Sequence, residues 1–228
     1  MTPPVVLAIA ATDPSGGAGL AADLTTLSAL GVHAACVVTA VTVQDTLGVR
    51  AIHHVPLEIV EAQLDAVLED LRPVVVKTGV LGTPEVVELV ASRCAGRVVV
   101  VDPVLRASTG AELADRDVLR AYTEVLLPVA DVLTPNEEEF EALGRPEHPG
   151  VVVTRGGPVV TSNDHGTGCT FASALAAHLA HGHDLPTATT RASAFVAGQL
   201  ALGSAWELGR GRGPVAHLTS PYAPQEIA

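Results

Sequence analysis

Short runs of apolar, β-branched residues alternate along this chain with longer segments that have the periodicity of a helix. Val5–Ala10 is such a run, and the turn residues Asp13 to Gly17 separate it from a predicted helix over Gly17–Leu30. Parallel strands need crossover connections of this kind, and right-handed crossovers place helices on both faces of a sheet. The alternation therefore predicts an α/β fold with a parallel sheet.

The same pattern continues to the end of the chain. Further strands are expected at Ala35–Val43, Val74–Val76, Arg97–Val101, Asp131–Leu133 and Gly150–Val153. Further helices are expected at Pro56–Leu71, Thr83 to about Arg93, Asp115–Leu127, Glu137–Leu143, Thr167 to about His181, and Pro186 to about Leu208. Residues 209–228 contain Gly and Pro and are expected to be irregular. We expect residues 1–228 to form a single domain.

Composition narrows the function classes. Hydrophobic residues make up 48% of the chain and aromatic residues only 3%, which suits strands buried beneath Ala- and Leu-rich helices. The net charge of −12 argues against binding to nucleic acid or an anionic membrane. Cys36, Cys94 and Cys169 lack metal-ligand spacing, no segment is long enough to span a membrane, and Val5–Ala11 is too short for a signal peptide. A cytoplasmic protein is expected.

The segment Asn163–Thr170 places small residues directly before the apolar run Phe171–Ala180. Such a turn at a helix N-terminus offers unpaired backbone N–H groups and the positive end of the helix dipole, and it therefore favours an anion. A thiol in that first turn, here Cys169, is expected to have a lowered pKa. A Gly-rich helix start with a buried cysteine is the alternative interpretation.

Polar residues follow most of the predicted strands. In parallel sheets, ligands bind outside the carboxyl ends of the strands, so these residues should share one edge. They are Asp13, Gln44, Lys77-Thr78, Asp102, Thr134 to Asn136, and Arg155 to Gly157. Carboxylates, an amide, a guanidinium and backbone donors in one crevice suit phosphoryl transfer, which depends on positioning and on neutralising oxyanions.

Seven motifs in this chain follow the order found in one family. They are Ala8–Gly19 with Ala22-Asp23-Leu24, Thr39–Thr46, Lys77–Gly82, Val101–Val104, Thr134–Glu139, His165–Thr170 and Gly211–Val215. With them the chain resembles the hydroxymethylpyrimidine/phosphomethylpyrimidine kinases of thiamine biosynthesis, in the ribokinase-like superfamily. The resemblance implies a single-domain, three-layer α/β/α sandwich with a mostly parallel central sheet.

The resemblance also implies a reaction and its residues. ATP and Mg²⁺ would serve to phosphorylate 4-amino-5-hydroxymethyl-2-methylpyrimidine and its monophosphate. Gly166, Thr167 and Gly168 would form the anion hole, with Cys169 in the position of the base. A homodimer is expected, with a small aminopyrimidine as substrate.

The remaining residue roles come from the same resemblance. The substrate would contact Asp23, Gln44, Gly17, Ala18, Val80 and Val104. The nucleotide would contact Asp102, Thr134, Asn136, Arg155 and Gly157, and Mg²⁺ would contact Asp102 and Glu139. Acids offsetting the dipole at a helix start are the alternative interpretation of Glu137 to Glu139. His165 could either stabilise phosphate or lock the loop.

Two features depart from the family pattern. Arg155-Gly156-Gly157 stands where the family usually has Lys-Gly-Gly, and Arg is larger and shaped differently from Lys. Only residues 158–164 separate this motif from His165, where the family carries a longer stretch that flanks the nucleotide. The adenine-side wall is therefore expected to be reduced.

Other functions remain open at this point. A pyridoxal/pyridoxine kinase shares the fold and also phosphorylates a hydroxymethyl group on a heteroaromatic ring. A pyrimidine-binding protein with impaired nucleotide use would fit the shortened segment. A phosphate-binding structural protein is a weaker alternative, because it leaves Asp23 and Gln44 unexplained.

Overall fold

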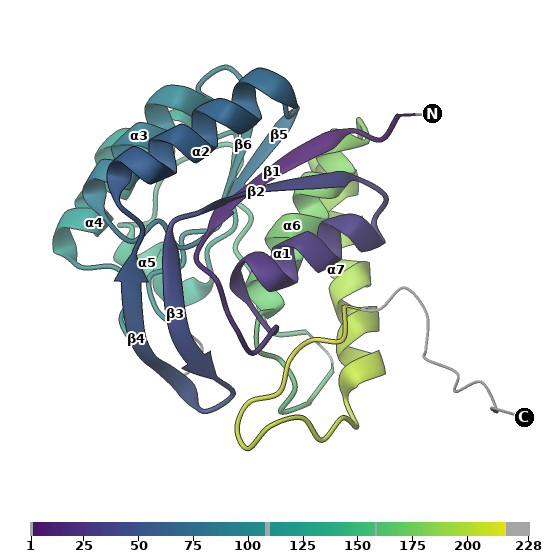
Figure 1. Ribbon diagram of the computed structural model, residues 1–228. Helices are drawn as coiled ribbons and strands as arrows, with labels where there is room; N and C mark the ends of the chain where they lie inside the picture. The colour runs from purple at the N-terminus through teal and green to yellow at the C-terminus, as the bar shows by residue number, and fades with distance from the viewer. Residues whose placement is uncertain (1, 108–109, 158, 218–228) are drawn as a thin grey trace, which may run out of the picture.

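The central sheet of the computed structural model is parallel, and the structure describes residues 2–107, 110–157 and 159–217. Within these residues the sheet has five strands in the order β2-β1-β5-β6-β7 (Figure 1). Their bounds are β1 Val5–Ala10, β2 His33–Val38, β5 Val75–Thr78, β6 Val98–Val101 and β7 Val132–Leu133. All four neighbouring pairs are parallel, which confirms the predicted sheet.

Helices cover both faces of the sheet and complete a three-layer, single-domain fold (Figure 1). One face carries α1 Gly19–Ala29, α6 Thr167–Ala180 and α7 Leu185–Gly203. The other carries α2 Leu57–Asp70, α3 Pro84–Cys94 and α4 Arg116–Ala121, which continues as a π turn over Tyr122–Leu126 and a 3₁₀ turn over Leu127–Val129. The short α5 spans Glu137–Ala142.

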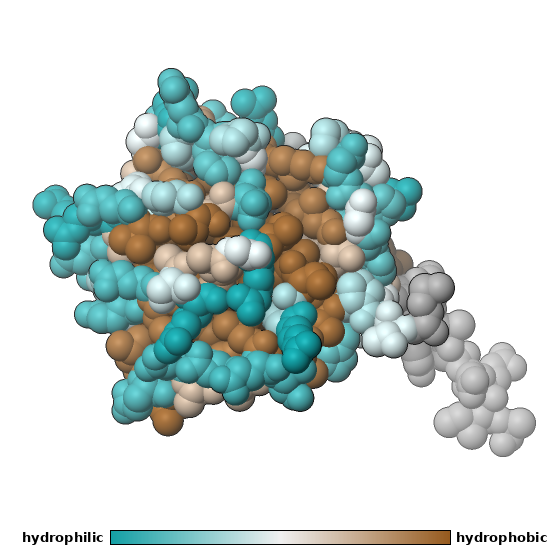
Figure 2. All heavy atoms as spheres, turned by 90° about the horizontal axis from the view of Figure 1, so that it is seen from above, coloured by the Kyte–Doolittle hydropathy of each residue, from teal (hydrophilic) through white to brown (hydrophobic). Residues whose placement is uncertain are grey.

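Apolar residues also reach the surface of this strongly hydrophobic chain. Figure 2 shows hydrophobic residues gathered in the middle of the upper face, with hydrophilic residues around them. The exposed large apolar side chains among the described residues are Val41, Val43, Leu47, Leu57, Ile59, Leu71, Val74, Val98, Val160 and Leu208. None of the described helices has the length and apolar character needed to cross a membrane.

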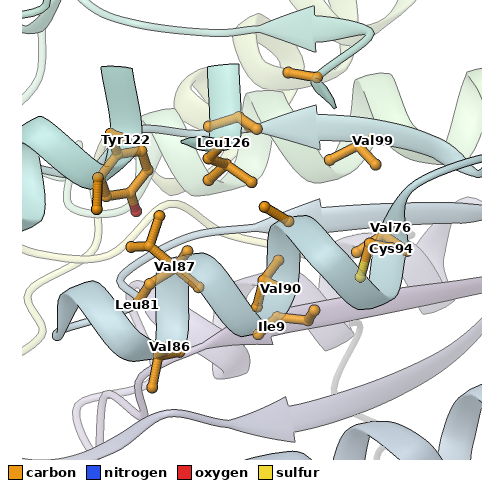
Figure 3. Packing of buried hydrophobic residues seen from close by; sticks show 14 of the residues in the cluster. Ile9, Val76, Leu81, Val86, Val87, Val90, Cys94, Val99, Tyr122 and Leu126 are labelled. Atoms are coloured by element: carbon orange, nitrogen blue, oxygen red, sulfur yellow. The ribbon is translucent and has the colours of Figure 1, made fainter. Parts of the chain in front are cut away.

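Strand β1 shows how one buried strand serves both faces. Leu7 and Ile9 pack with the α2–α4 side, whereas Val6 and Ala8 pack with the α1–α6–α7 side. Successive strand side chains point to opposite faces, so a strand covered on both faces must be apolar throughout. Figure 3 shows the first of these cores, where α3 lies over the sheet beside the π turn.

The predicted strand Ala35–Val43 is instead two strands. β2 ends at Val38, and Thr39 bonds in two directions: its N–H donates to Ala10 O at 3.1 Å and its hydroxyl donates to Val80 O at 2.6 Å. The chain then leaves the sheet as β3 Ala40–Asp45, which pairs antiparallel with β4 Gly48–His54, a strand that sequence reasoning missed. This hairpin places Gln44 beside the main sheet rather than at one of its strand ends.

Two further expectations at the C-terminal half need correction. Gly150–Val153 is not a strand: it forms one isolated parallel bridge, Val151 with Leu133, and Thr154 just after it forms another with Asn136. Helix α7 ends at Gly203 rather than near Leu208. Residues 209–217 are irregular, as expected, and residues 218–228 of the predicted tail lie outside the described residues.

Candidate active site

A cavity of about 780 Å³ opens at the carboxyl ends of the parallel strands. Residues that follow β1, β5, β6 and β7 line it, together with the β3–β4 hairpin, the N-terminus of α6 and one side of α7. The predicted site residues that line it are Ala18, Gln44, Val80, Asp102, Val104, Thr134, Asn136, Glu139, Arg155, Gly157, Gly166, Thr167, Gly168 and Cys169. Gly17 and Asp23 are not among them.

The turn before α6 requires glycine at its first position. Gly166 has a φ of +84°, and a Cβ there would lie 1.7 Å from Gly17 O. Thr167 begins the helix and its N–H donates to Asp164 O at 3.2 Å, whereas Gly168 and Cys169 follow in the first turn, where helix N–H groups lack a carbonyl one turn earlier. The helix N-terminus therefore faces the cavity with the geometry of an anion site.

Beneath this turn lies a buried cation that the sequence placed at this edge of the sheet but to which it gave no role. Lys77 on β5 is completely buried, and its Nζ lies 2.7 Å from Asp23 Oδ1 and 3.6 Å from Asp102 Oδ2. Ser173 on α6 donates a second hydrogen bond to Asp23 Oδ1, at 2.8 Å. Burial opposes the charged form of Lys77, but the negative charges of Asp23, Cys169 and Asp102 outweigh it and raise the lysine pKa. The feature of the sequence that could have indicated this role was a lysine within a four-residue buried strand.

Asp23 does not fit the predicted contact with substrate. Its side chain is fully buried under the cavity floor, where it bonds Lys77 and Ser173. Gly17 also contacts protein: a Cβ there would lie 2.4 Å from His165 Cδ2. Both residues therefore support the site from below or beside it, because neither lines the cavity.

The pKa of Cys169 moves opposite to our expectation. Burial raises it to about 12; the charges of Asp102 and Asp23 act in the same direction, whereas Lys77 acts against them. The helix N-terminus was expected to lower this pKa, but the sequence did not reveal two carboxylates beside the thiol. Burial likewise raises the pKa of the neighbouring Asp102 carboxyl to about 6, against the opposing effect of Lys77.

His165 locks the loop after β1 against the anion turn. Its Nε2 lies 2.8 Å from Asp13 Oδ2, and Asp13 also accepts from the backbone and hydroxyl of Ser15 and from Ala18 N–H. Burial would raise the Asp13 pKa, but the hydrogen bonds from His165 and Ser15 outweigh it and lower the pKa. Gln44 Nε2 lies 3.2 Å from His165 Nε2, so the Gln44 amide joins the same cluster.

Asn136 and Glu139 form a capping box at the start of α5. Asn136 N–H donates to Glu139 Oε2, and Glu139 N–H donates to Asn136 Oδ1, both at 2.9 Å. Glu139 is 8% exposed, and burial followed by the charge of Asp102 raises its pKa to about 8. Glu137 and Glu138 are exposed, which is typical of acids that offset a helix dipole.

Replacing Glu139 with glutamine is expected to remove a pH dependence of stability. The pKa of Glu139 in the folded protein, about 8, exceeds its ordinary value of 4.5. The protonated carboxyl therefore makes its full contribution to the free energy of unfolding below pH 4.5, and this contribution is lost as the pH rises through 8. The unfolding free energy of the wild type should therefore fall, relative to Glu139→Gln, by up to about 1.4 kcal/mol per pH unit within that window. Urea unfolding between pH 5 and 9 measures it, with exposed Glu138→Gln as control. Equal pH slopes in wild type and Glu139→Gln would contradict the assignment.

The side of the cavity near Arg155 and residues 159–164 lacks regular structure of its own. Residues 159–164 form no helix or strand in the described part of the chain, and Asn163 anchors them by donating to Gly203 O and Trp206 O, each at 2.8 Å. Arg155 is exposed, with its Nε 3.6 Å from Glu137 Oε2. Helix α7 contributes Thr189, Ser193, Val196, Ala197 and Leu200 to the cavity lining.

The donors fit a hard cation that keeps most of its ligands outside the protein. No group of three or more His, Cys, Asp or Glu side chains suited to a metal occurs among the described residues. Asp102 Oδ2 is nevertheless buried without a hydrogen-bond partner there, and Glu139 lines the same cavity. One or two carboxylates plus substrate phosphates is the usual Mg²⁺ arrangement in kinases.

Comparisons with known proteins agree with this geometry. The family model described as phosphomethylpyrimidine kinase matches residues 13–151 and 147–216. The hydroxymethylpyrimidine/phosphomethylpyrimidine kinase of Rhizobium meliloti is 39% identical over 257 residues, covering 94% of this chain and 97% of the relative. The corresponding kinase of Haemophilus influenzae is 36% identical, covering 93% and 96%.

Solved structures give the same fold. The pyridoxal kinase of Staphylococcus aureus in complex with pyridoxal superposes with a TM-score of 0.83 at 29% identity, covering 95% of this chain and 94% of that one. The same kinase has been solved in complex with ADP, with a TM-score of 0.82. The phosphomethylpyrimidine kinase of Clostridium difficile superposes with a TM-score of 0.73 at 30% identity, covering 86% and 98%.

Proposed function

The chain belongs to the phosphomethylpyrimidine kinase family, and we infer from this that it phosphorylates 4-amino-5-hydroxymethyl-2-methylpyrimidine and then its monophosphate in thiamine biosynthesis. One observation connects this activity with particular residues of the chain. The anion turn of α6 and the amide of Gln44 line the same cavity, at the edge where the strands of a parallel sheet end.

Each side of the cavity has a distinct role in the proposal. Gln44 holds the aminopyrimidine, because its amide offers a donor and an acceptor to a ring nitrogen beside an exocyclic amine. Ala18, Val80 and Val104 surround the ring. The backbone of Gly166 to Gly168 holds the transferred phosphoryl group. Cys169 stands in the position of the base, and it accepts the proton of the attacking hydroxyl only as the thiolate, so binding of the substrates must first lower its raised pKa.

ATP is the phosphoryl donor, with Thr134, Asn136, Arg155 and Gly157 on its side of the cavity. Asp102 and Glu139 are the residues that would hold Mg²⁺, which supplies positive charge to neutralise the nucleotide phosphates. Neutralising Asp102 would also remove one of the causes of the raised Cys169 pKa. The short, irregular segment before Asn163 makes the adenine end of this side open.

The deciding experiment is ADP release by the purified protein, at millimolar ATP and Mg²⁺, with the pyrimidine alcohol, its monophosphate or pyridoxal as acceptor. We expect turnover with both pyrimidines and a lower kcat/KM with pyridoxal, which enters the comparison because a pyridoxal kinase shares the fold. No turnover with either pyrimidine would overturn the proposal. Tight pyrimidine binding by calorimetry without turnover would instead identify a binding protein with impaired nucleotide use.

We also propose that the protein is a cytoplasmic homodimer. The outward face of the β3–β4 hairpin carries Val41 and Val43, each about half exposed, and Leu47 extends it at the tip. A two-stranded sheet with an apolar outer face gains stability when another surface covers it. Sedimentation velocity showing only a monomer at micromolar concentration would rule out the dimer, and activity confined to a membrane fraction of lysed cells would rule out the compartment.

A further inference from the structure

Thr46, in the turn of the β3–β4 hairpin, is held by a segment more than 160 residues later in the chain. The backbone N–H groups of Arg210 and Gly211 both donate to Thr46 Oγ1 at 3.1 Å. The N–H of Arg212 donates to Thr46 O at 2.9 Å. We call residues Gly209–Gly213 the strap; in Figure 1 this yellow segment passes beside the tip of the hairpin. Three consecutive amides therefore converge on one threonine.

Glycine is required where the strap meets the hairpin. A Cβ at Gly211 would lie 2.1 Å from Thr46 O, and a Cβ at Gly209 would lie 2.4 Å from Thr46 Oγ1. Gly209 also has a φ of +77°, which side chains rarely adopt. The alternation of glycine with arginine in this segment thus allows the backbone to lie directly against the hairpin.

The other end of the strap contacts the residues that precede the anion turn. Gly213 O accepts from His165 N–H at 3.0 Å, and Gly213 N–H donates to Ser162 O at 3.1 Å. The guanidinium of Arg212 grips both carboxylate oxygens of Asp164, with Nη2 2.6 Å from Oδ2. A planar guanidinium bound to a carboxylate at two points fixes orientation as well as distance.

The strap therefore links the two halves of the site. Gln44 lies two residues before Thr46, and Gly166 follows His165 directly. The hairpin is a separate two-stranded sheet, and isolated hairpins are marginally stable. Phosphoryl transfer requires the attacking oxygen and the anion hole to be placed to within about 1 Å, since a misplacement of that size can cost about 10²-fold in rate.

We propose that Thr46 and Arg212 are positioning residues, and that the strap through them holds the Gln44 hairpin in register with the anion turn. This rests on the proposed function for the identity of the acceptor. Arg212 also lines the cavity, and the strap acts by fixing the distance between the group that holds the acceptor ring and the group that holds the phosphoryl.

Two substitutions release the strap in different ways. Thr46→Val removes the hydroxyl that accepts two amides but keeps the β-branched shape, and Gly211→Ala places a methyl group against Thr46 O. We expect kcat/KM for the pyrimidine alcohol to fall about 10-fold to 10²-fold in each, through both a higher KM for the pyrimidine and a lower kcat. The KM for ATP should stay within about twofold of wild type.

Matched controls separate this effect from general damage. Thr25→Val removes an exposed threonine hydroxyl that bonds Ala21 O on α1, and Gly198→Ala adds a methyl group where nothing lies within 4 Å. Both controls should keep wild-type kinetics. Unchanged pyrimidine kinetics in Thr46→Val and Gly211→Ala would overturn the proposal. Equal falls in kcat/KM for pyrimidine and for ATP that follow a fall in Tm would also overturn it, because a strap that only stabilised the fold would affect both substrates alike.

Hydrogen exchange makes the result independent of the substrate assignment. If the strap holds both segments, Thr46→Val should increase amide exchange in residues 40–54 and in residues 162–168, and Thr25→Val should not. If Thr46→Val exchanges faster in both segments but the wild type turns over neither pyrimidine, the strap is supported and the proposed function is rejected. Unchanged exchange in residues 162–168 would overturn the strap, whatever the acceptor proves to be.

Discussion

Replacing Cys169 with alanine is expected to lower kcat by about 10²–10⁴, the usual range for a positioned acid–base group. The thiol lies in the first turn of α6 and lines the cavity within the electrostatic influence of Asp102, and its removal leaves the anion turn in place. The KM values for pyrimidine and ATP should therefore change much less than kcat. Steady-state ADP release with each pyrimidine measures the effect.

The chain supplies its own control for this experiment. Cys36 on β2 is a free, half-buried cysteine that does not line the cavity. Cys36→Ala should leave kcat within about twofold of wild type, whereas Cys169→Ser should lose about as much as Cys169→Ala, because a serine hydroxyl is a far weaker base at neutral pH than a thiolate. A Cys169→Ala enzyme with less than a tenfold fall in kcat would remove Cys169 from the role of base.

Replacing Lys77 with methionine is expected to destabilise the protein by about 3–5 kcal/mol, because it leaves buried carboxylates without their cation. Lys77 and Asp23 are both completely buried, and Asp102 is nearly so. Removing the partner as well, in Lys77→Met/Asp23→Leu, should restore most of the unfolding free energy, since apolar residues of similar volume often replace a buried ion pair without loss. Urea unfolding, with the midpoint and the slope compared, measures both changes.

The kcat of these variants should separate the role of Lys77 in stability from its electrostatic role in the site. The double substitution still leaves Asp102 and Cys169 without the positive charge beside them, so kcat should remain low after stability returns. Arg93→Met is the control: its partners Glu61 and Asp65 are exposed, and such pairs contribute at most about 1 kcal/mol. A loss below about 1 kcal/mol in Lys77→Met, or a double variant no more stable than the single one, would contradict this account of the buried cluster.

The sequence predicted the parallel sheet well because its strands are buried on both faces. Val5–Ala10 and Val98–Val101 are apolar throughout, and no other environment suits such runs between helices. The same criterion, an unbroken apolar run, gave the wrong prediction of a single strand at Ala35–Val43. The chain stays apolar there, and only the bonds of Thr39 to Ala10 and Val80 show that one strand ends and a hairpin begins. Those bonds join segments that are distant in the chain.

Most of the site residues that the sequence predicted do line the cavity. Residues that follow parallel strands must share one edge, and a Gly-rich turn before an apolar run must present a helix N-terminus. Neither rule says whether a side chain faces the cavity or lies beneath it. The family resemblance assigned Asp23 and Gly17 to the substrate, although both contact protein, and Lys77 was placed at this edge without a role.

By itself, then, the sequence determined the fold class, the edge at which the cavity forms and the glycine turn that faces it, because these follow from local pattern and from the direction of parallel strands. Only the tertiary structure decided the charge environment of Cys169. Its pKa depends on Asp102, Asp23 and Lys77, which come from three other elements of the fold. Electrostatic energies depend on distance and burial, and neither is fixed until the chain has packed.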